Sequence, residues 1–164
     1  MNSYDLIDEA VIGASPDLVW ESLVAELRGA ARWWVPYNTF EPGTVPPDQV
    51  GGEVRVTVHT RGVDRRGLKL RFTARTRSVN PGRQLVADYV DGVFRGSCEY
   101  VLDPVDGGQC TRLSMHFRAW PHGWLRHLAR VADISMEHSK ATQLAFAHLD
   151  ALLGAARSAD RSRR

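Results

Sequence analysis

Two different hydrophobic patterns divide the N-terminal part of the chain. Residues 3–13, SYDLIDEAVIG, hold enough leucine, isoleucine and valine to predict a β-strand. The next segment, ASPDLVWESLVAEL, has apolar residues at helical spacing, namely Trp20, Leu23, Val24 and Leu27. Ser15 suits the N-cap of this helix, Pro16 suits its first turn, and Gly29 can end it. The pattern therefore predicts a strand followed directly by an amphipathic helix.

Two adjacent tryptophans follow this helix. A second short helix is predicted over residues 30–34, AARWW, and it should end before Pro36, because the residue preceding a proline disfavours the helical conformation. Neighbouring side chains on a helix point in different directions, so Trp33 and Trp34 are expected to face different surroundings. Either one indole packs under a sheet while the other faces an opening, or both fill the end of the core.

From residue 52 the hydrophobic period changes to two, which is the period of β-strands. Residues 52–60, GEVRVTVHT, and 67–79, GLKLRFTARTRSV, alternate apolar with polar side chains. This alternation is typical of an antiparallel sheet that has one apolar face and one solvated face. The solvated face would carry a group of arginines: Arg55, Arg71, Arg75 and Arg95.

Asp91-Gly92 predicts a hairpin between the next two strands. This residue pair is preferred in two-residue hairpin turns, which would place Tyr89 opposite Phe94 and Asp88 opposite Arg95. Asp88 and Arg95 would then form a surface ion pair worth under about 1 kcal/mol. The apolar residues on both strands of this hairpin fall on one face, so the turn and the hydrophobic pattern agree.

A further hairpin is predicted around the segment DPVDGGQC. With Val105–Gly108 as its loop, Cys98 would lie opposite Met115 and far from Cys110. We therefore expect no disulfide, and the two cysteines are interpreted as buried apolar side chains or free thiols.

The helical period returns near Pro121 and continues to about Ala156. The segment HGWLRHLARVADISMEHSKATQLAFAHLDALL predicts one long C-terminal helix. Its middle is polar where a core helix would be apolar, since Ser135, His138 and Thr142 fall near the expected inner stripe. This polarity fits a helix that borders a cavity, unless the helical phase is different from the one assumed here.

The chain resembles the helix-grip superfamily of START domains and the major birch pollen allergen, which includes bacterial polyketide cyclases. The resemblance covers about residues 4–154 and is carried by AVIGASPDLVWESL, by DGVFRGSCEYVLDPVDGGQCTRLSMHF and by the long final helix. It implies an α+β fold in which a strongly curved antiparallel sheet, of about six or seven strands, surrounds the C-terminal helix, with two short helices after the first strand. These motifs are informative about architecture and carry little information about chemistry.

In such a fold the apolar face of the sheet would line a cavity. The predicted inner face of the later strands is aliphatic and aromatic and carries no charged residue or histidine. Pockets lined in this way suit apolar or aromatic ligands. The candidate ligand-binding residues are Trp33, Trp34, Tyr37, Phe40, Phe72, Tyr89, Phe94, Tyr100, Met115, Phe117, Trp124, Met136 and His138.

Few residues suggest catalysis. His138 could polarise a carbonyl or act as a general base, and Tyr89 and Tyr100 could donate hydrogen bonds to a ligand carbonyl. Each is also explained as a solvated histidine or a core tyrosine with a wet tip. The spacing of the histidines predicts no metal site, and no nucleotide-binding or nucleophile motif predicts a cofactor.

Composition and charge limit the remaining classes. The chain has 164 residues, which suits one domain over residues 1–154, followed by a flexible basic tail over residues 155–164. That tail holds four arginines and one aspartate, which leaves 17 of the 21 basic and 18 of the 19 acidic residues in the body. A nearly neutral body argues against nucleic-acid binding. With no apolar run of membrane-spanning length and no signal segment, we expect a cytoplasmic protein without stable membrane insertion.

Three functions fit this sequence. The first is binding or carriage of a hydrophobic small molecule such as a lipid, quinone, polyketide or aromatic compound. The second is a cyclase or aromatase that uses the cavity tyrosines and histidine. The third is an interaction module that docks a partner through the arginine-rich sheet face. The sequence favours the first, does not decide whether the protein is an enzyme, and is compatible with a monomer or a homodimer.

Overall fold

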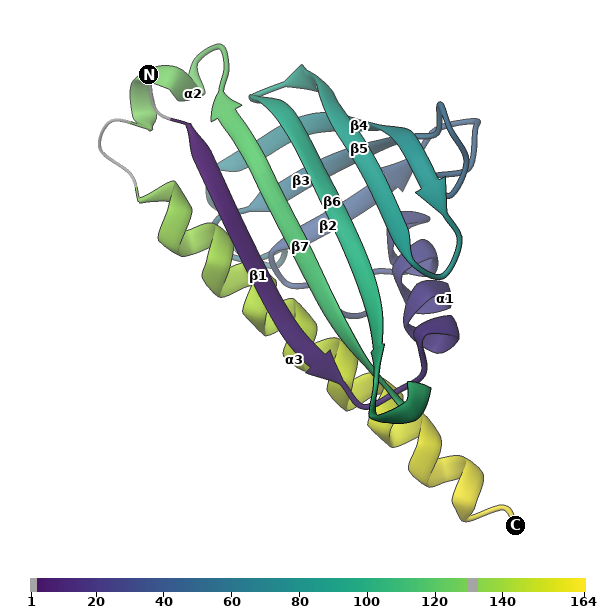
Figure 1. Ribbon diagram of the computed structural model, residues 1–164. Helices are drawn as coiled ribbons and strands as arrows, with labels where there is room; N and C mark the ends of the chain where they lie inside the picture. The colour runs from purple at the N-terminus through teal and green to yellow at the C-terminus, as the bar shows by residue number, and fades with distance from the viewer. Residues whose placement is uncertain (1–2, 130–132) are drawn as a thin grey trace.

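Seven antiparallel strands form one curved sheet in the computed structural model, which describes residues 3–129 and 133–164 (Figure 1). In spatial order they are β1 (Tyr4–Ile12), β7 (Cys110–Pro121), β6 (Phe94–Val105), β5 (Gln84–Gly92), β4 (Lys69–Asn80), β3 (Glu53–His59) and β2 (Asn38–Pro42). Two register shifts interrupt the pairing of β4 with β5, between Thr73 and Ala74 and between Thr76 and Ser78. Irregularities of this kind bend a strand, and they help the sheet to curl.

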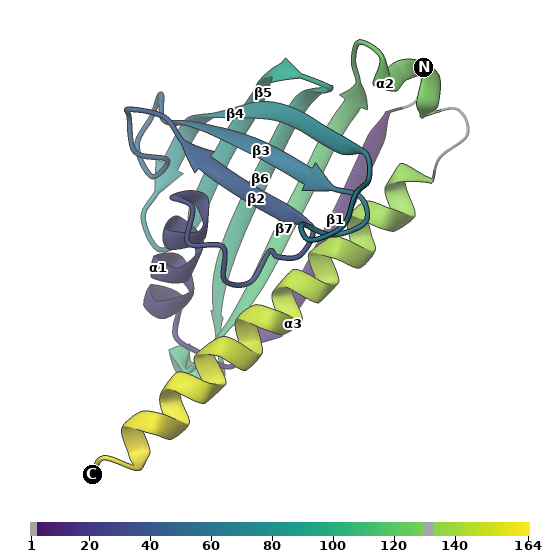
Figure 2. The same cartoon turned by 180° about the vertical axis from the view of Figure 1, so that it is seen from behind.

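The helices occupy the open side and one end of the sheet. They are α1 (Pro16–Leu27), the short 3₁₀ turn η1 (Asp106–Gly108), α2 (Leu125–Leu128) and α3 (Ile134–Arg161). Figure 2 shows α3 running obliquely across the open side of the sheet, with its C-terminal end projecting beyond the strands. The predicted helix-grip architecture is confirmed. In the part of the chain that the structure describes, no helix is both long and apolar enough to cross a membrane.

The second short helix predicted over residues 30–34 is wrong, because this segment is irregular and bends at residues 32–34. Ala31 takes a left-handed backbone conformation with φ of 52°, which a right-handed helix does not allow. The backbone N–H groups that a helix would have used are bound by the side chain of Glu26, as described below. The two tryptophans therefore stand on a side-chain-stabilised turn.

Both predicted hairpins exist, but the predicted pairing is wrong by two residues in each. Tyr89 lies opposite Gly96 instead of Phe94, and Cys98 lies opposite Phe117 instead of Met115. An even shift keeps every side chain on its predicted face, which is why the inner face was still predicted correctly. Cys98 and Cys110 are free cysteines, and the sequence predicted no disulfide between them.

The first shift arises because Asp91-Gly92 does not form the tight turn. Gly92 remains paired with Phe72 of β4, and a Cβ atom on Gly92 would lie 2.2 Å from the carbonyl oxygen of Arg71. Glycine is thus needed at this position for the close approach of β4. In consequence Asp88 lies opposite Ser97, and it forms an ion pair with Arg77 at 3.1 Å instead of the predicted one with Arg95.

The C-terminal helix starts later than predicted. β7 continues to Pro121, α2 follows, and α3 begins only at Ile134. Asp133 caps α3, since its side chain accepts a hydrogen bond from the backbone N–H of Met136 at 3.0 Å. Residues 130–132 of the predicted helix lie outside the described residues. At the other end α3 extends to Arg161, so the first seven residues of the predicted tail are helical and exposed.

Candidate functional site

A cavity of about 220 Å³ lies between the concave face of the sheet and α3. Residues from β2 to β7 and from all three α-helices line it, and most of the lining is apolar. Nine of the predicted ligand-binding residues lie on its wall: Trp34, Phe40, Phe72, Tyr89, Phe94, Tyr100, Met115, Phe117 and His138. The sequence therefore predicted the sheet side of this cavity well, because strand alternation assigns its faces.

Four predicted residues do not line the cavity. Trp33 is only 1% exposed and packs against the ring of Phe146, with the two ring centres 6.5 Å apart. Tyr37 precedes β2 outside the cavity wall. Trp124 and Met136 are 49% and 48% exposed and face away from the cavity. Of the two adjacent indoles, Trp33 is in the core and Trp34 faces the cavity.

The buried carboxylate of Glu26 positions both tryptophans. Glu26 is 1% exposed, and its Oε2 accepts hydrogen bonds from the backbone N–H groups of Trp33 at 2.8 Å and Trp34 at 2.7 Å. Its Oε1 accepts a third from the N–H of Arg32 at 2.8 Å. A buried carboxylate needs such donors to replace water. Sequence reasoning missed Glu26, and its only signal was an acidic residue among the apolar positions Val24 and Leu27 of the helix.

Aromatic rings form a cluster on the wall of the cavity, away from Trp34. Phe72 contacts Tyr89 and Phe94 edge to face, with ring centres 5.0 Å and 5.2 Å apart. Phe94 in turn meets the edge of Phe117 at 5.6 Å. Edge-to-face pairs are favoured by the quadrupoles of the rings. The imidazole of His138 stacks on Phe117 from the helix side at 4.1 Å, and so connects α3 to this cluster.

Two tyrosines bring hydroxyl groups to the apolar wall. Burial raises the pKa of Tyr89 and of Tyr100 well above 10, so both phenols stay protonated at neutral pH and can donate hydrogen bonds. The hydroxyl of Tyr89 interacts with the thiol of Cys98. Burial also raises the pKa of that thiol to about 11, which makes Cys98 a poor nucleophile.

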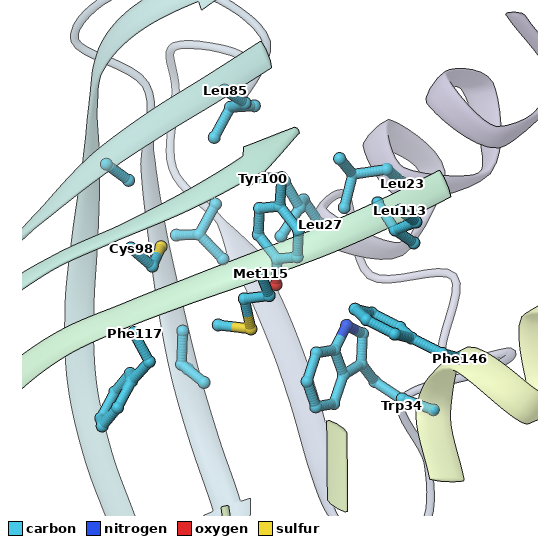
Figure 3. Packing of buried hydrophobic residues seen from close by; sticks show 14 of the residues in the cluster. Leu23, Leu27, Trp34, Leu85, Cys98, Tyr100, Leu113, Met115, Phe117 and Phe146 are labelled. Atoms are coloured by element: carbon cyan, nitrogen blue, oxygen red, sulfur yellow. The ribbon is translucent and has the colours of Figure 1, made fainter. Parts of the chain in front are cut away.

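The indole N–H of Trp34 faces the hydroxyl of Tyr100. It approaches closely enough to lower the pKa of Tyr100, against the larger effect of burial. The two atoms do not reach hydrogen-bond geometry, and Nε1 of Trp34 is buried without a hydrogen-bond partner among the described residues. Figure 3 shows the Tyr100 ring directed toward Trp34, with Met115 beside them.

The inner face of β1, whose faces the sequence analysis did not assign, carries a charged residue. Asp8 lies on the inner face of β1 and is 7% exposed. Its carboxylate accepts hydrogen bonds from Ser139 at 3.0 Å and from Gln143 at 3.3 Å, both on α3. Asp8 was missed because the strand prediction did not assign the faces of β1. These contacts fix the rotation of α3 about its own axis.

That rotation places one stripe of α3 on the cavity: Ile134, Glu137, His138 and Ala141. The next residues on the buried side of α3, toward its C-terminus, are Thr142, Ala145 and Phe146. The polar middle of the helix is thus explained by two surfaces, one facing the cavity and one facing Asp8.

His138 is neutral at physiological pH. Burial lowers its pKa to about 4, although the nearby carboxylate of Asp8 acts in the opposite direction. An unprotonated imidazole beside the cavity can accept a proton or a hydrogen bond. Among the residues placed on the cavity wall, it is the group best suited to act as a base.

We expect stability to fall as the pH decreases from about 6.5 toward 4, because the unfolded chain then binds a proton that folded His138 excludes. The loss should be about 1 kcal/mol per pH unit. Burial lowers the pKa of His59 as well, which adds an effect in the same direction. Denaturant titrations at pH 6.5 and 5.0 should therefore show a smaller difference for His138→Phe than for the wild type. The exposed control His127→Asn should retain the full difference.

The donor set of the described residues does not suggest a metal centre. Within residues 3–129 and 133–164, no three histidine, cysteine or acidic side chains are grouped so that they could hold an ion. The polar groups at the cavity include phenols, an indole N–H, an imidazole, the amide of Asn38, the hydroxyls of Thr60 and Thr76, and the carboxylates of Asp133 and Glu137. This arrangement can bind, orient and exchange a proton with an organic molecule.

Comparison with known proteins defines the class. The chain belongs to the family described as polyketide cyclase/dehydrase and lipid transport, which matches residues 7–142. No curated protein sequence matches it. Among solved structures, a protein from Thermus thermophilus is similar with a TM-score of 0.69 and 16% identity, covering 93% of this chain and 99% of that one.

Two further structures share the fold. An aromatase/cyclase from Streptomyces sp. R1128 has a TM-score of 0.63 and 17% identity, and the match covers 91% of this chain and 94% of that one. A protein from Mycobacterium smegmatis has a TM-score of 0.64 and 19% identity, with 95% and 98% covered. At these identities the similarity establishes the helix-grip fold.

Proposed function

We propose that this protein binds and carries a hydrophobic small molecule in its internal cavity. The observation that carries this proposal is an apolar cavity of about 220 Å³ between the concave face of the sheet and α3. An apolar cavity of roughly 150 Å³ is enough to hold benzene. The space here suits a somewhat larger compact molecule, and membership of a family of cyclases and lipid-transport proteins supports a ligand of this kind.

Filling the cavity from α3 should weaken binding strongly and leave the fold intact. Ala141 lines the cavity, whereas Ala147 on the same helix is exposed. We expect Ala141→Phe to weaken binding of the hydrocarbon 2-isopropenylnaphthalene at least about tenfold, because the new ring occupies the ligand's space. Equilibrium dialysis measures this, with Ala147→Phe as the matched control. A wild type that binds no probe of this size, or equal affinity in both variants, would contradict the proposal.

A cyclase-type enzyme is the second candidate, and the observation that favours it is that neutral His138 and protonated Tyr89 and Tyr100 line the same cavity. A base that removes a proton next to a carbonyl, together with phenols that stabilise the developing oxyanion, would promote aldol cyclisation. Heptane-2,4,6-trione is a suitable probe, since its cyclisation and loss of one water yields orcinol. Turnover that disappears in His138→Phe would favour the enzyme over the carrier.

The arginine-rich face is less favoured as an interaction surface. Arg75 already pairs with Glu53 at 2.6 Å, and Arg95 donates hydrogen bonds to the carbonyl oxygens of Gly92 and Phe94. Two of the four predicted arginines therefore already have partners within the sheet itself.

A further inference from the structure

One polar position in the cavity is left without a partner. Tyr100 is 3% exposed and lines the cavity, and its hydroxyl faces the indole N–H of Trp34, a donor that cannot accept the phenolic proton. Nε1 of Trp34 lacks a hydrogen-bond partner among the described residues. Buried donors without acceptors cost roughly 1–3 kcal/mol each. A buried indole N–H and a phenolic proton at one place in an apolar cavity indicate that an acceptor from outside the protein belongs there.

The other phenol of the cavity does not share this property. Tyr89 also lines the wall, but its hydroxyl already interacts with the thiol of Cys98. Tyr89 packs edge to face on Phe72, within the aromatic cluster at the other end. The cavity is therefore asymmetric, with an aromatic end and a hydrogen-bond-donating end.

The charge of the wall indicates a neutral occupant. Among the described residues no lysine or arginine side chain lines the cavity, whereas Asp133 and Glu137 do. Burial raises the pKa of both cavity phenols, which means that the interior disfavours an anion even on its own side chains. A ligand carboxylate would meet the same desolvation cost without a compensating cation.

We propose that the cavity selects a neutral, compact aromatic molecule that carries a carbonyl-type oxygen, which accepts a hydrogen bond from the hydroxyl of Tyr100. The aromatic part of the ligand lies toward Phe72 and Phe117. Trp34 is a positioning residue, because its N–H faces the Tyr100 oxygen and leaves the phenolic proton free for the ligand. This inference rests on the proposed binding function and specifies the ligand class.

The test uses three probes of matched shape. 2-Acetylnaphthalene carries the acceptor oxygen, 2-isopropenylnaphthalene replaces that oxygen with a methylene group, and 2-naphthoate carries a charge. Equilibrium dialysis at pH 7.5 gives the affinity of each. Water also solvates the ketone, so the informative quantity is the ratio of ketone affinity to hydrocarbon affinity, compared between the wild type and a variant.

Tyr100→Phe removes only the hydroxyl and keeps the ring. We expect it to lower the ketone-to-hydrocarbon ratio about tenfold, since a buried hydrogen bond is lost and the ligand oxygen is left unpaired. Tyr37→Phe is the matched control and should change the ratio less than about twofold, because Tyr37 lies outside the cavity wall. In the wild type, 2-naphthoate should bind at least about tenfold more weakly than the ketone.

Trp34→Phe tests the positioning role. In the otherwise wild-type protein, it should lower the ratio of ketone affinity to hydrocarbon affinity about threefold. In the Tyr100→Phe background it should leave this ratio unchanged, because Trp34 acts through Tyr100. A ligand-independent structural role of Trp34 would change both affinities equally and leave the ratio constant. Circular dichroism of each variant confirms that it is folded.

The outcomes separate this inference from the proposed function. If the hydrocarbon and the ketone both bind and Tyr100→Phe leaves their ratio unchanged, the ligand class is wrong while the binding function stands. Tighter binding of 2-naphthoate than of the ketone would also overturn it. If none of the probes binds to the wild type, the proposed function itself fails.

Discussion

Glu26→Ala is expected to lower the free energy of unfolding by about 3–4 kcal/mol, because three backbone N–H groups lose a charged acceptor at once. These groups lie at the buried turn before β2, where water cannot easily replace the carboxylate. The same substitution should weaken probe binding, since it releases the turn that places Trp34 on the cavity wall. Guanidinium titration of the purified variants measures the first effect and equilibrium dialysis the second.

Two variants control this experiment. Glu26→Gln keeps one acceptor oxygen and the side-chain volume, so its loss should be smaller than that of the alanine variant. Glu21→Ala removes an exposed acid from the same helix and should change stability by less than about 0.5 kcal/mol. Equal stabilities for Glu26→Ala and Glu21→Ala would show that the buried carboxylate does not hold the turn.

Gly96→Ala is the second substitution with a large expected effect. Gly96 has φ of 126°, and a Cβ atom there would lie 2.1 Å from the carbonyl oxygen of Arg118 and 2.7 Å from Cα of Ala119. Both atoms belong to the backbone of β7, so relief requires β6 and β7 to separate. We expect a loss of about 3 kcal/mol or more, from the strained backbone and the weakened strand pairing.

Gly154→Ala provides the opposite outcome in the same assay. Gly154 lies on the exposed part of α3, and a Cβ atom there would meet nothing within 4 Å. Alanine in a helix is favoured over glycine, so this variant should gain up to about 1 kcal/mol. A Gly96→Ala protein as stable as the wild type would mean that β6 and β7 are not held as closely as the structure indicates.

The hairpins show how local signals and tertiary pairing compete. Asp91-Gly92 is a strong turn signal, yet Gly92 pairs with Phe72 and the reversal occurs after it. The close approach of β4 to Gly92 was not visible in the chain, because it depends on a strand 20 residues away. The face of each residue could still be predicted, since side-chain direction follows parity and a shift of two leaves parity unchanged.

The residues of the candidate site also fall into two groups, those predicted from a local pattern and those decided by tertiary contacts. Strand alternation was enough to predict Phe72, Tyr89 and Phe117 on the cavity wall. It was not enough for Trp124 and Met136, because their direction depends on where a helix begins and how it is rotated. Asp133 sets the start of α3, and the hydrogen bonds of Asp8 to Ser139 and Gln143 hold its rotation.

The sequence by itself determined the first strand and helix, the run of strands from β3 to β7, their inner face and the apolar nature of the interior. These properties follow from hydrophobic periods along neighbouring residues. Only the tertiary structure decided which tryptophan faces the cavity, which phenol keeps its proton free for a ligand and which side of α3 closes the space. Those features depend on Glu26, Asp8 and Tyr100, which act through contacts of single side-chain atoms. No periodic pattern records such contacts, because one carboxylate or one hydroxyl leaves the hydrophobic period unchanged.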